Sequence, residues 1–551
     1  MTEAHHGNSI QSPASQTPVL VSILLAIALY LAAVALGWPQ AGTRMILGSG
    51  HDADQHEAEH AAGHDVAAPA DAAAPPAEPD WPTTEPADHA AHHAAPEPPA
   101  LWMVLPFVLI LGAIAVFPLV PGVSHWWESN LHRFEVAALL GALTLGYYLL
   151  LHAHPVERHF LGHAIAEPAA GSPSFGVTWT VFQNAIFNEY VPFIILLFSL
   201  YTISGGIRIE GDLRAHPLVN SSFLAIGAVL ASFIGTTGAA MLLVRPLLET
   251  NRERKHVAHT AVFFIFIVCN CGGCLTPLGD PPLFLGYLQG VPFLWTFKLW
   301  RQWLLVNGLL LVVYFLWDHF YAYPRETKSD IARDERMISK LRFSGVLVNG
   351  TLLALLIVSV ALLDPAKTIP GTDWHPWLFL REAVQLGLVA ASLGLGPAAV
   401  RAANRFSYGA IVEVAVLFLG IFICMQPALQ ILDARGAQLG IDTPHKFFWA
   451  TGILSSVLDN APTYLVFFKA AQSLHTPGAA TMAGVNVDVL AAISLGAVFM
   501  GAMTYIGNGP NFMVKAIAES SGVKMPGFFG YIVYSVLVLL PILVLATFVC
   551  M

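Results

Sequence analysis

The residues best suited to chemistry lie in two polar stretches that interrupt apolar segments. The first is Thr276-Pro-Leu-Gly-Asp-Pro-Pro282, and the second is Thr504-Tyr-Ile-Gly-Asn-Gly-Pro510. Proline removes a backbone donor and clashes with the preceding turn, so neither stretch forms a regular, continuous helix. A sodium site needs several oxygens, and unwound carbonyls, hydroxyls, amides and a carboxylate supply them. The chemistry that these stretches offer is therefore the binding of a small cation.

The two stretches correspond position by position. At a constant offset of 228 residues, four positions match: Thr276 with Thr504, Gly279 with Gly507, Asp280 with Asn508, and Pro282 with Pro510. Irregular backbone at membrane depth survives only where protein or a water-filled cavity satisfies it. Paired interruptions at corresponding places in two halves are typical of a transporter's binding site.

Two more polar tips lie at the centres of apolar blocks. Residues 218–248 contain Gly235-Thr236-Thr237-Gly238, and residues 447–471 contain Leu458-Asp459-Asn460-Ala461-Pro462-Thr463. Lys and Arg flank the first block on both sides, which places both its ends in the cytoplasm, whereas the second block is expected to have both flanks outside. We expect two re-entrant hairpins that enter from opposite faces of a membrane.

Composition sets the class of protein. Of 551 residues, 56% are hydrophobic and 11% charged, and the mean hydropathy is +0.62. Soluble proteins carry about 25% charged residues, and a helix of about 20 apolar residues crosses a bilayer. The sequence predicts an all-α polytopic membrane protein with about 11 transmembrane helices, and not an enzyme. No basic field suits nucleic acid, so the expected partners are lipid and a small cation or organic anion.

The basic residues orient the chain. The strongest run, residues 325–342, is expected in the cytoplasm, which places the N-terminus inside and the C-terminus outside a bacterial inner membrane. Whether the first helix is an anchor or a cleaved signal stays open. The predicted segments are an anchor (1–40), a disordered extracytoplasmic His/Ala/Pro-rich loop (41–100), a first transport repeat (101–323), a cytoplasmic linker (324–342) and a second repeat (343–551).

The repeat is expected to be inverted. The helix that follows Glu189 matches the helix that follows Glu413 at an offset of 224, and the order of helix, hairpin tip, basic residue and broken helix occurs twice. Five predicted crossings separate the starts of the two units. Because five is odd, the second unit is upside down relative to the first, and such repeats hold a substrate site near the midplane.

The His-rich loop carries a second possible chemistry. Residues 56–60 read His-Glu-Ala-Glu-His, a formal match to the zinc-protease pattern, but that pattern needs a buried amphipathic helix and a third ligand. Three interpretations stay open: a solvated spacer, loose capture of a divalent metal by His56, His60 and His64, and a membrane-anchored zinc enzyme. Beyond that metal, no cofactor is expected.

The hairpin Ser455-Ser-Val-Leu-Asp-Asn-Ala-Pro462 and the two Thr-x-x-Gly-x-x-Pro breaks resemble the ion transporter superfamily of arsenite permeases and NhaD-type sodium/proton antiporters. The nearest pattern is the NhaD-like and citrate-transport branch, over about residue 189 to the C-terminus. The dicarboxylate carriers of the superfamily have Ser-Asn-Thr at both tips, which this chain lacks. The resemblance implies a homodimer, and one cation site in each half, built from a hairpin tip and a broken helix.

Mapped onto this chain, the resemblance assigns candidate cation and proton ligands in each half: Thr236, Thr237, Thr276 and Asp280 in the first, and Asp459, Asn460, Thr463, Thr504 and Asn508 in the second. An intramembrane carboxylate is costly and indicates function. The alternative is that Asp280 and Asp459 cap the half-helices that follow them.

Two basic and two acidic residues hold similar places in both halves. Arg245 and Lys469 either tune the site by pairing with Glu189 and Glu413, or extend to the headgroups. The remaining candidates shape the backbone, and substitution of the glycines should fail because of bulk rather than charge: Gly235, Gly238, Gly279, Pro281, Pro282, Pro462, Gly507, Gly509 and Pro510.

Two functions follow. In the first, a sodium/proton antiporter works by alternating access, because a buried carboxylate holds a proton or a cation but not both. In the second, the same fold carries citrate, a metal–citrate complex or a related anion together with protons or sodium, since half-helix N-termini suit an anion.

Overall fold

The computed structural model describes residues 16–48, 97–162, 164–168, 173–474 and 480–550. The proposed loop ligands His56, His60 and His64 lie outside these residues. Within the described chain, eight helical segments are long and apolar enough to cross a membrane, and three shorter apolar helices accompany them. The prediction of an all-α polytopic membrane protein is confirmed.

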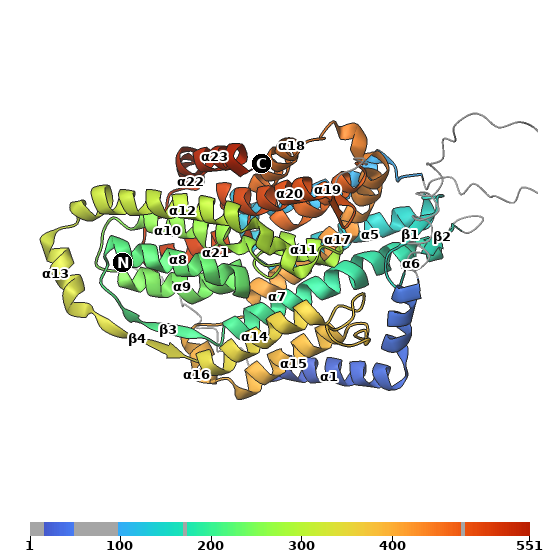
Figure 1. Cartoon of the computed structure of the whole chain (residues 1–551), viewed down its shortest axis with the longest axis horizontal. Coiled ribbons are helices and arrows are strands. Elements are labelled where there is room, and N and C mark those ends of the chain that lie inside the picture. The colour runs from blue at the N-terminus through green and yellow to red at the C-terminus, as the bar shows by residue number, and fades with distance from the viewer. Residues whose placement is uncertain (1–15, 49–96, 163, 169–172, 475–479, 551) are drawn as a thin grey trace, which may run out of the picture.

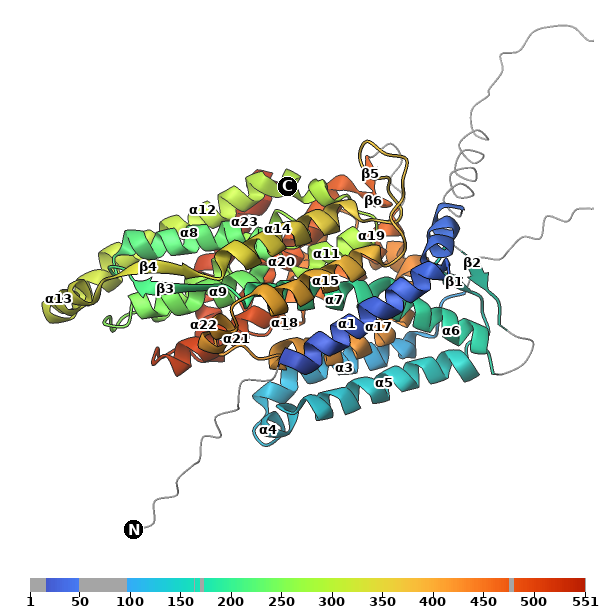
Figure 2. The same ribbon diagram turned by 90° about the horizontal axis from the view of Figure 1, so that it is seen from below.

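The first part of the chain forms mainly peripheral helices and ends in the largely buried α7 (Val191–Ser204). The helices before it are α1 (Gln16–Ala35), α3 (Leu105–Val116), α4 (Val123–Trp127), α5 (Asn130–Leu150) and α6 (Phe175–Gln183). α1 packs along α15 (Leu380–Leu395), and its other faces are largely exposed (Figure 2). Residues 38–48 are also helical, although they fall mostly in the segment predicted to be disordered.

One helix begins earlier than predicted. The apolar run suggested a start at Tyr190, but a π-helical turn (Asn184–Tyr190) joins α6 to α7, so helix runs from Phe175 to Ser204. The polar residues Asn184 and Glu189 are buried in that turn. The hydropathy pattern did not predict this part of the helix, because its buried polar residues lower the mean hydropathy of the segment.

The middle of the chain contains the first hairpin and the first broken helix. Its helices are α8 (Pro217–Ile234), α9 (Thr236–Thr250), α10 (Ala258–Ile267), α11 (Pro281–Leu288), α12 (Trp300–Trp317) and α13 (Lys328–Met337). α8 and α9 pack side by side and meet at Gly235 (Figure 1). α8 is long enough to span a membrane, so its role as a re-entrant arm stays a prediction.

The last part repeats the order of hairpin and broken helix after four further α-helices. The helices are α14 (Val346–Leu362), α15, α16 (Ala398–Ala403), α17 (Gly409–Arg435), α18 (Pro444–Val457), α19 (Asn460–Gln472), α20 (Val487–Met500), α21 (Gly509–Ser520), α22 (Phe528–Tyr534) and α23 (Leu540–Cys550). α17 packs against α5 and α19, and α18 packs against α20. The helix pair α18–α19 and the break between α20 and α21 fall where the sequence predicts them.

Three short antiparallel strand pairs accompany the helices. The pairs are β1 (Val156–Arg158) with β2 (Ala164–Ala166), β3 (Arg208–Asp212) with β4 (Ser339–Ser344), and β5 (Thr481–Met482) with β6 (Val485–Asn486). The second pair joins the segment after α7 to the segment before α14. Both segments carry basic residues that predict a cytoplasmic position, and their pairing places them on one side of the molecule.

A buried ion pair anchors the loop between α9 and α10 to the end of α12. Arg254 Nη2 lies 2.5 Å from Asp318 Oδ1, and the side chains are 3% and 0% exposed. The His259 ring Nε2 lies 3.1 Å from the same oxygen. These contacts hold α10, the first half of the broken helix, against α12.

We expect Asp318→Asn to lower the free energy of unfolding by about 1.5–3 kcal/mol, because it removes the closer of two acidic partners of the buried Arg254 guanidinium. The other partner, Glu326, lies 3.7 Å from Arg254 Nε and remains. Thermal unfolding in detergent measures the effect. Asp442→Asn is the control, because Asp442 pairs with Lys446 on the surface at 60% exposure, and its midpoint should not change. Equal midpoints for Asp318→Asn and the wild type would contradict this account.

Candidate functional site

Four irregular points of the chain meet at the carboxylate of Asp280. Asp280 Oδ1 accepts hydrogen bonds from the Thr236 hydroxyl (3.0 Å) and the Asn508 amide (3.1 Å), and Oδ2 accepts one from the Asn460 amide (2.6 Å). Asp280 and Asn508 come from the two broken helices, and Thr236 and Asn460 from the two hairpin tips. All four are buried. We expected one cluster in each half, whereas these residues form one cluster across both halves.

Backbone contacts explain why Asp280 faces this cluster. Gly235 has φ +80°, which lets the chain reverse between α8 and α9. The Thr236 amide then donates to the Gly279 carbonyl (2.8 Å), which fastens the hairpin tip to the break. Asp280 is the N-cap residue of α11 but makes no capping hydrogen bond. The capping alternative therefore does not describe Asp280.

The two breaks share the same local hydrogen bonds. The Thr276 hydroxyl donates to the Ser232 carbonyl, and the Thr504 hydroxyl donates to the Ser456 carbonyl (2.6 Å). The same threonine oxygens accept from the amides two residues later, at 3.2 and 3.1 Å. Thr276 and Thr504 thus fasten each break to the preceding hairpin, and their hydroxyls do not contact Asp280.

Glycines at the breaks allow backbone segments to touch. A Cβ on Gly507 would lie 2.6 Å from the Gly501 carbonyl oxygen, and one on Gly279 would collide with the Gly273 carbonyl. At Gly238 a Cβ would lie 3.3 Å from Ser204 Oγ. Gly509 corrects our expectation that every one of these glycines excludes bulk, since a Cβ there would meet nothing within 4 Å.

The prolines begin the half-helices. Pro281 and Pro282 start α11 and Pro510 lies in the first turn of α21, where the missing backbone donor has no helical acceptor. Pro462 lies in the first turn of α19. The prolines therefore define where each helix restarts after its break.

Two asparagines that sequence reasoning missed link the breaks. The Asn270 side chain accepts from the Asn508 amide (3.2 Å) and donates to Asn511 Oδ1 (2.7 Å). Asn511 donates in turn to the carbonyls of Gly501 (2.8 Å) and Thr504 (3.0 Å). Asn270 interrupts an apolar helix and Asn511 directly follows Pro510, which are signals that could have identified both.

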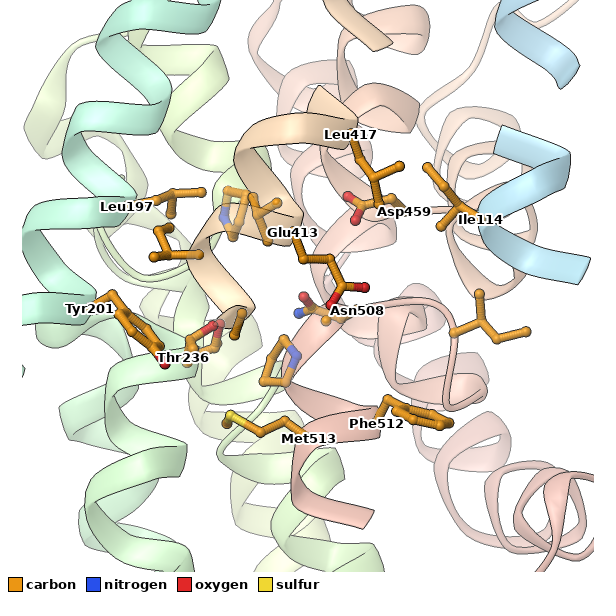
Figure 3. Close-up of a pocket in the computed structure, with 18 of the residues that line it drawn as sticks. Ile114, Leu197, Tyr201, Thr236, Glu413, Leu417, Asp459, Asn508, Phe512 and Met513 are labelled. Atoms are coloured by element: carbon orange, nitrogen blue, oxygen red, sulfur yellow. The ribbon is translucent and has the colours of Figure 1, made fainter. Parts of the chain in front are cut away.

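Asp459 lies apart from this cluster. Its Oδ1 accepts from the Ala461 amide (3.0 Å) and caps α19, and its carbonyl accepts from the Thr463 hydroxyl (2.9 Å). Asp459 also lines a cavity of about 540 Å³ together with Thr236, Thr237 and Asn508 (Figure 3). Asp459 therefore both caps α19 and lines the cavity.

The cavity carries charged residues from the surrounding helices. Glu413 of α17 projects into it in Figure 3, and Arg133 of α5 lies 3.0 Å from its carboxylate. Glu128 and Lys515 also line the cavity. Arg133, Glu128 and Lys515 were not among the predicted site residues, because only the three-dimensional packing brings α5 and α21 to the cavity.

The remaining predicted residues take different positions. Glu189 is buried, accepts from the Gln426 amide (3.3 Å), and interacts electrostatically with Lys469. Arg245 is exposed, and its charged neighbours are Arg405 and Arg208. Arg245 does not line the cavity. Within the described residues, no group of three or more His, Cys, Asp and Glu side chains could hold a metal ion.

A family model described as "Putative citrate transport" matches residues 97–551. The chain belongs to this family. The match covers both hairpins and both breaks, and it begins after most of the His-rich loop. It supports the citrate-transport branch of the predicted resemblance and does not single out the NhaD or arsenite permease type. No curated protein matched the chain. The protein is thus a multi-pass membrane member of a transporter family.

Proposed function

We propose that this transporter couples its cargo to a cation at Asp280, with sodium/proton antiport as the first candidate. One observation carries the proposal. Asn460 Oδ1 is buried beside Asp280 and lacks a hydrogen-bond partner among the described residues. Buried polar atoms normally have partners, and an unpaired oxygen next to a carboxylate is a ligand that a sodium ion would take.

Competition between a proton and a sodium ion for the Asp280 cluster would produce sodium/proton exchange. A proton on Asp280 neutralises the buried charge, and sodium bound by Asp280, Asn460 Oδ1 and the Thr236 oxygen does the same. Each state excludes the other, and both avoid an uncompensated charge in a low dielectric. Of the charged side chains that line the adjacent cavity, three are acidic and two basic, which favours entry of cations.

Alternating access is part of the proposal. The repeated threonine bonds and the close glycine contacts support two related units. We propose that these units are inverted, so that each opens toward a different side of the membrane. Asp280, held by groups from both units, would then face each side in turn.

Citrate symport is the second candidate, favoured by the family description and by Arg133 and Lys515 on the cavity wall. Basic side chains bind carboxylates. Because acidic side chains outnumber the basic ones in the lining, a metal–citrate complex of low charge suits the cavity better than the free trianion.

Proton movement in proteoliposomes distinguishes the candidates. Sodium, lithium, or citrate with and without magnesium is added to the wild type, to Asp280→Asn and to Arg133→Gln. For the antiporter we expect proton movement that is driven by sodium, lost in Asp280→Asn and retained in Arg133→Gln. Citrate symport would replace antiport if protons moved only with citrate. That movement should then be lost in Arg133→Gln and retained in Arg435→Gln, the exposed control. No response to any of these solutes would contradict both.

A further inference from the structure

The strongest unexplained feature outside the cavity is an arginine without a counter-charge. Three arginines are buried in the described part of the chain: Arg254, Arg381 and Arg401. Arg254 lies 2.5 Å from Asp318, and Arg381 lies 2.6 Å from Glu382. Arg401 is 1% exposed, yet no carboxylate of the described residues pairs with it. A buried unpaired charge is costly, so this site needs a separate explanation.

The donors of Arg401 are also incompletely used. Nη2 donates to Ser392 Oγ (2.5 Å) and, at 3.5 Å, to the Thr202 carbonyl. Nε and Nη1 are buried without a hydrogen-bond partner in the described structure, as are the hydroxyls of Thr202 and Tyr408. Tyr408 is the group that interacts electrostatically with Arg401. Unpaired polar atoms gathered at one place indicate a missing partner.

The charges around Arg401 indicate what kind of ligand would bind there. Burial lowers the pKa of the Arg401 guanidinium, and only Tyr408 acts in the opposite direction. The end of α7 contributes a partial negative charge through the Thr202 carbonyl, but this carbonyl contacts Nη2 alone. The excess charge at the site is positive, so an anion is favoured over neutral water.

The surface beside Arg401 adds further positive charge. Arg405 is exposed and follows α16 with φ +50°, and the Phe406 amide donates to the Arg401 carbonyl (3.0 Å). This helix end usually takes glycine, since left-handed backbone costs other residues about 1–2 kcal/mol. Arg245 interacts electrostatically with Arg405 and Arg208. Among the described residues, only Arg208 of this group has an acidic partner, Glu210, at 2.5 Å.

Two glycines lie against the guanidinium, where a larger side chain would not fit. A Cβ on Gly206 would lie 2.8 Å from Arg401 Nη2, and one on Gly396 would lie 3.1 Å from Nη1. The segment that leads from Arg401 to Tyr408 is largely exposed at Arg405 and Ser407. Because Arg401 is only 1% exposed, a ligand from the surface could reach it only if this segment were displaced.

We propose that Arg401 and Tyr408 form an anion site for a phosphate group, supplied either by free phosphate or by the headgroup of an anionic lipid. Arg401 Nε and Nη1 and the Tyr408 hydroxyl donate to its oxygens, and Arg405 attracts it to the surface. The site lies in the α7–α16 region and borders the cavity, which Tyr201 and Ala410 line, but Arg401, Arg405 and Tyr408 are not cavity-lining residues. The proposal does not depend on which cargo the transporter carries.

Thermal unfolding of the delipidated full chain in neutral detergent tests the site. Tryptophan fluorescence is followed while sodium phosphate is titrated against sodium chloride at fixed sodium concentration and ionic strength. Short-chain phosphatidic acid is titrated against phosphatidylcholine in parallel. We expect a saturable rise of a few degrees that Arg401→Gln abolishes and Arg435→Gln retains. A response to free phosphate identifies a soluble ligand, and a response to phosphatidic acid alone identifies a lipid headgroup.

Tyr408→Phe keeps the test decisive if Arg401→Gln does not fold. It preserves the ring that packs against Phe406 at 5.1 Å and removes one donor. We expect the apparent affinity to fall about tenfold, the usual effect of losing one hydrogen bond to a charged group. No saturable response to either ligand, or an affinity unchanged in both variants, would overturn the proposal and leave Arg401 a water-bound structural residue.

Discussion

Asp280→Asn is expected to abolish coupled transport while leaving the protein folded. The carboxylate accepts three hydrogen bonds, one from each of the other three irregular points of the chain. An amide can accept fewer and cannot exchange a proton for a cation. Hydrogen bonds to a charged group contribute about 1.5–3 kcal/mol each, so the transport rate should fall about 100-fold or more. Proton and solute fluxes in proteoliposomes measure the loss.

A matched control shows whether the effect comes from losing any carboxylate or from losing the one at Asp280. Asp373→Asn removes an exposed carboxylate and should leave both fluxes at the wild-type rate. Gel filtration and the unfolding midpoint establish that Asp280→Asn is folded. Wild-type flux with unchanged ion dependence in a folded Asp280→Asn protein would remove Asp280 from the coupling mechanism, and Asp459 would then be the carboxylate to test.

Gly279→Ala and Gly507→Ala are expected to destabilise the protein strongly. At each position the added methyl group would meet backbone carbonyls rather than movable side-chain ends: those of Gly501 and Ser455 at 2.6 and 2.7 Å for Gly507, and that of Gly273 for Gly279. Overpacking of this kind costs about 1–3 kcal/mol, and more where the backbone cannot yield. Lowered unfolding midpoints and reduced yield of folded protein are the measurements.

Gly509→Ala provides the comparison for this effect. Gly509 has open space around its Cβ position, starts α21, and should therefore keep the wild-type midpoint, or exceed it slightly because alanine favours helix. If Gly507→Ala unfolds at the same temperature as Gly509→Ala, the close backbone approach does not contribute to stability.

The sequence predicted the local features of this protein well. Proline and glycine at 279–282 and 507–510 located both breaks, because these residues constrain their own backbone. Basic residues indicated that the segments around Arg208 and Arg342 share a side, and β3–β4 pairing agrees. The pattern also selected Thr236, Asp280, Asn460 and Asn508, which the structure brings together.

What the sequence could not predict depends on packing between distant segments. Asn460 lies 180 residues from Asp280, and no local pattern indicates that the tip of one half contacts the break of the other. Arg133 enters the cavity because α5 packs against α17. The burial of Glu189 in a π-helical turn was also not predicted, because that turn has no hydropathy signal.

The sharing of Asp280 between both halves affects how the protein is made. The carboxylate leaves the ribosome 180 residues before Asn460 and 228 residues before Asn508. At about 5–20 residues per second, roughly ten seconds or more pass before two of the three side chains that donate to Asp280 have been synthesised. Until then, the nascent helices must keep Asp280 protonated or in contact with water. The hydrogen-bond cluster around Asp280 is therefore completed late in biosynthesis, only after the second hairpin and the second break have been inserted.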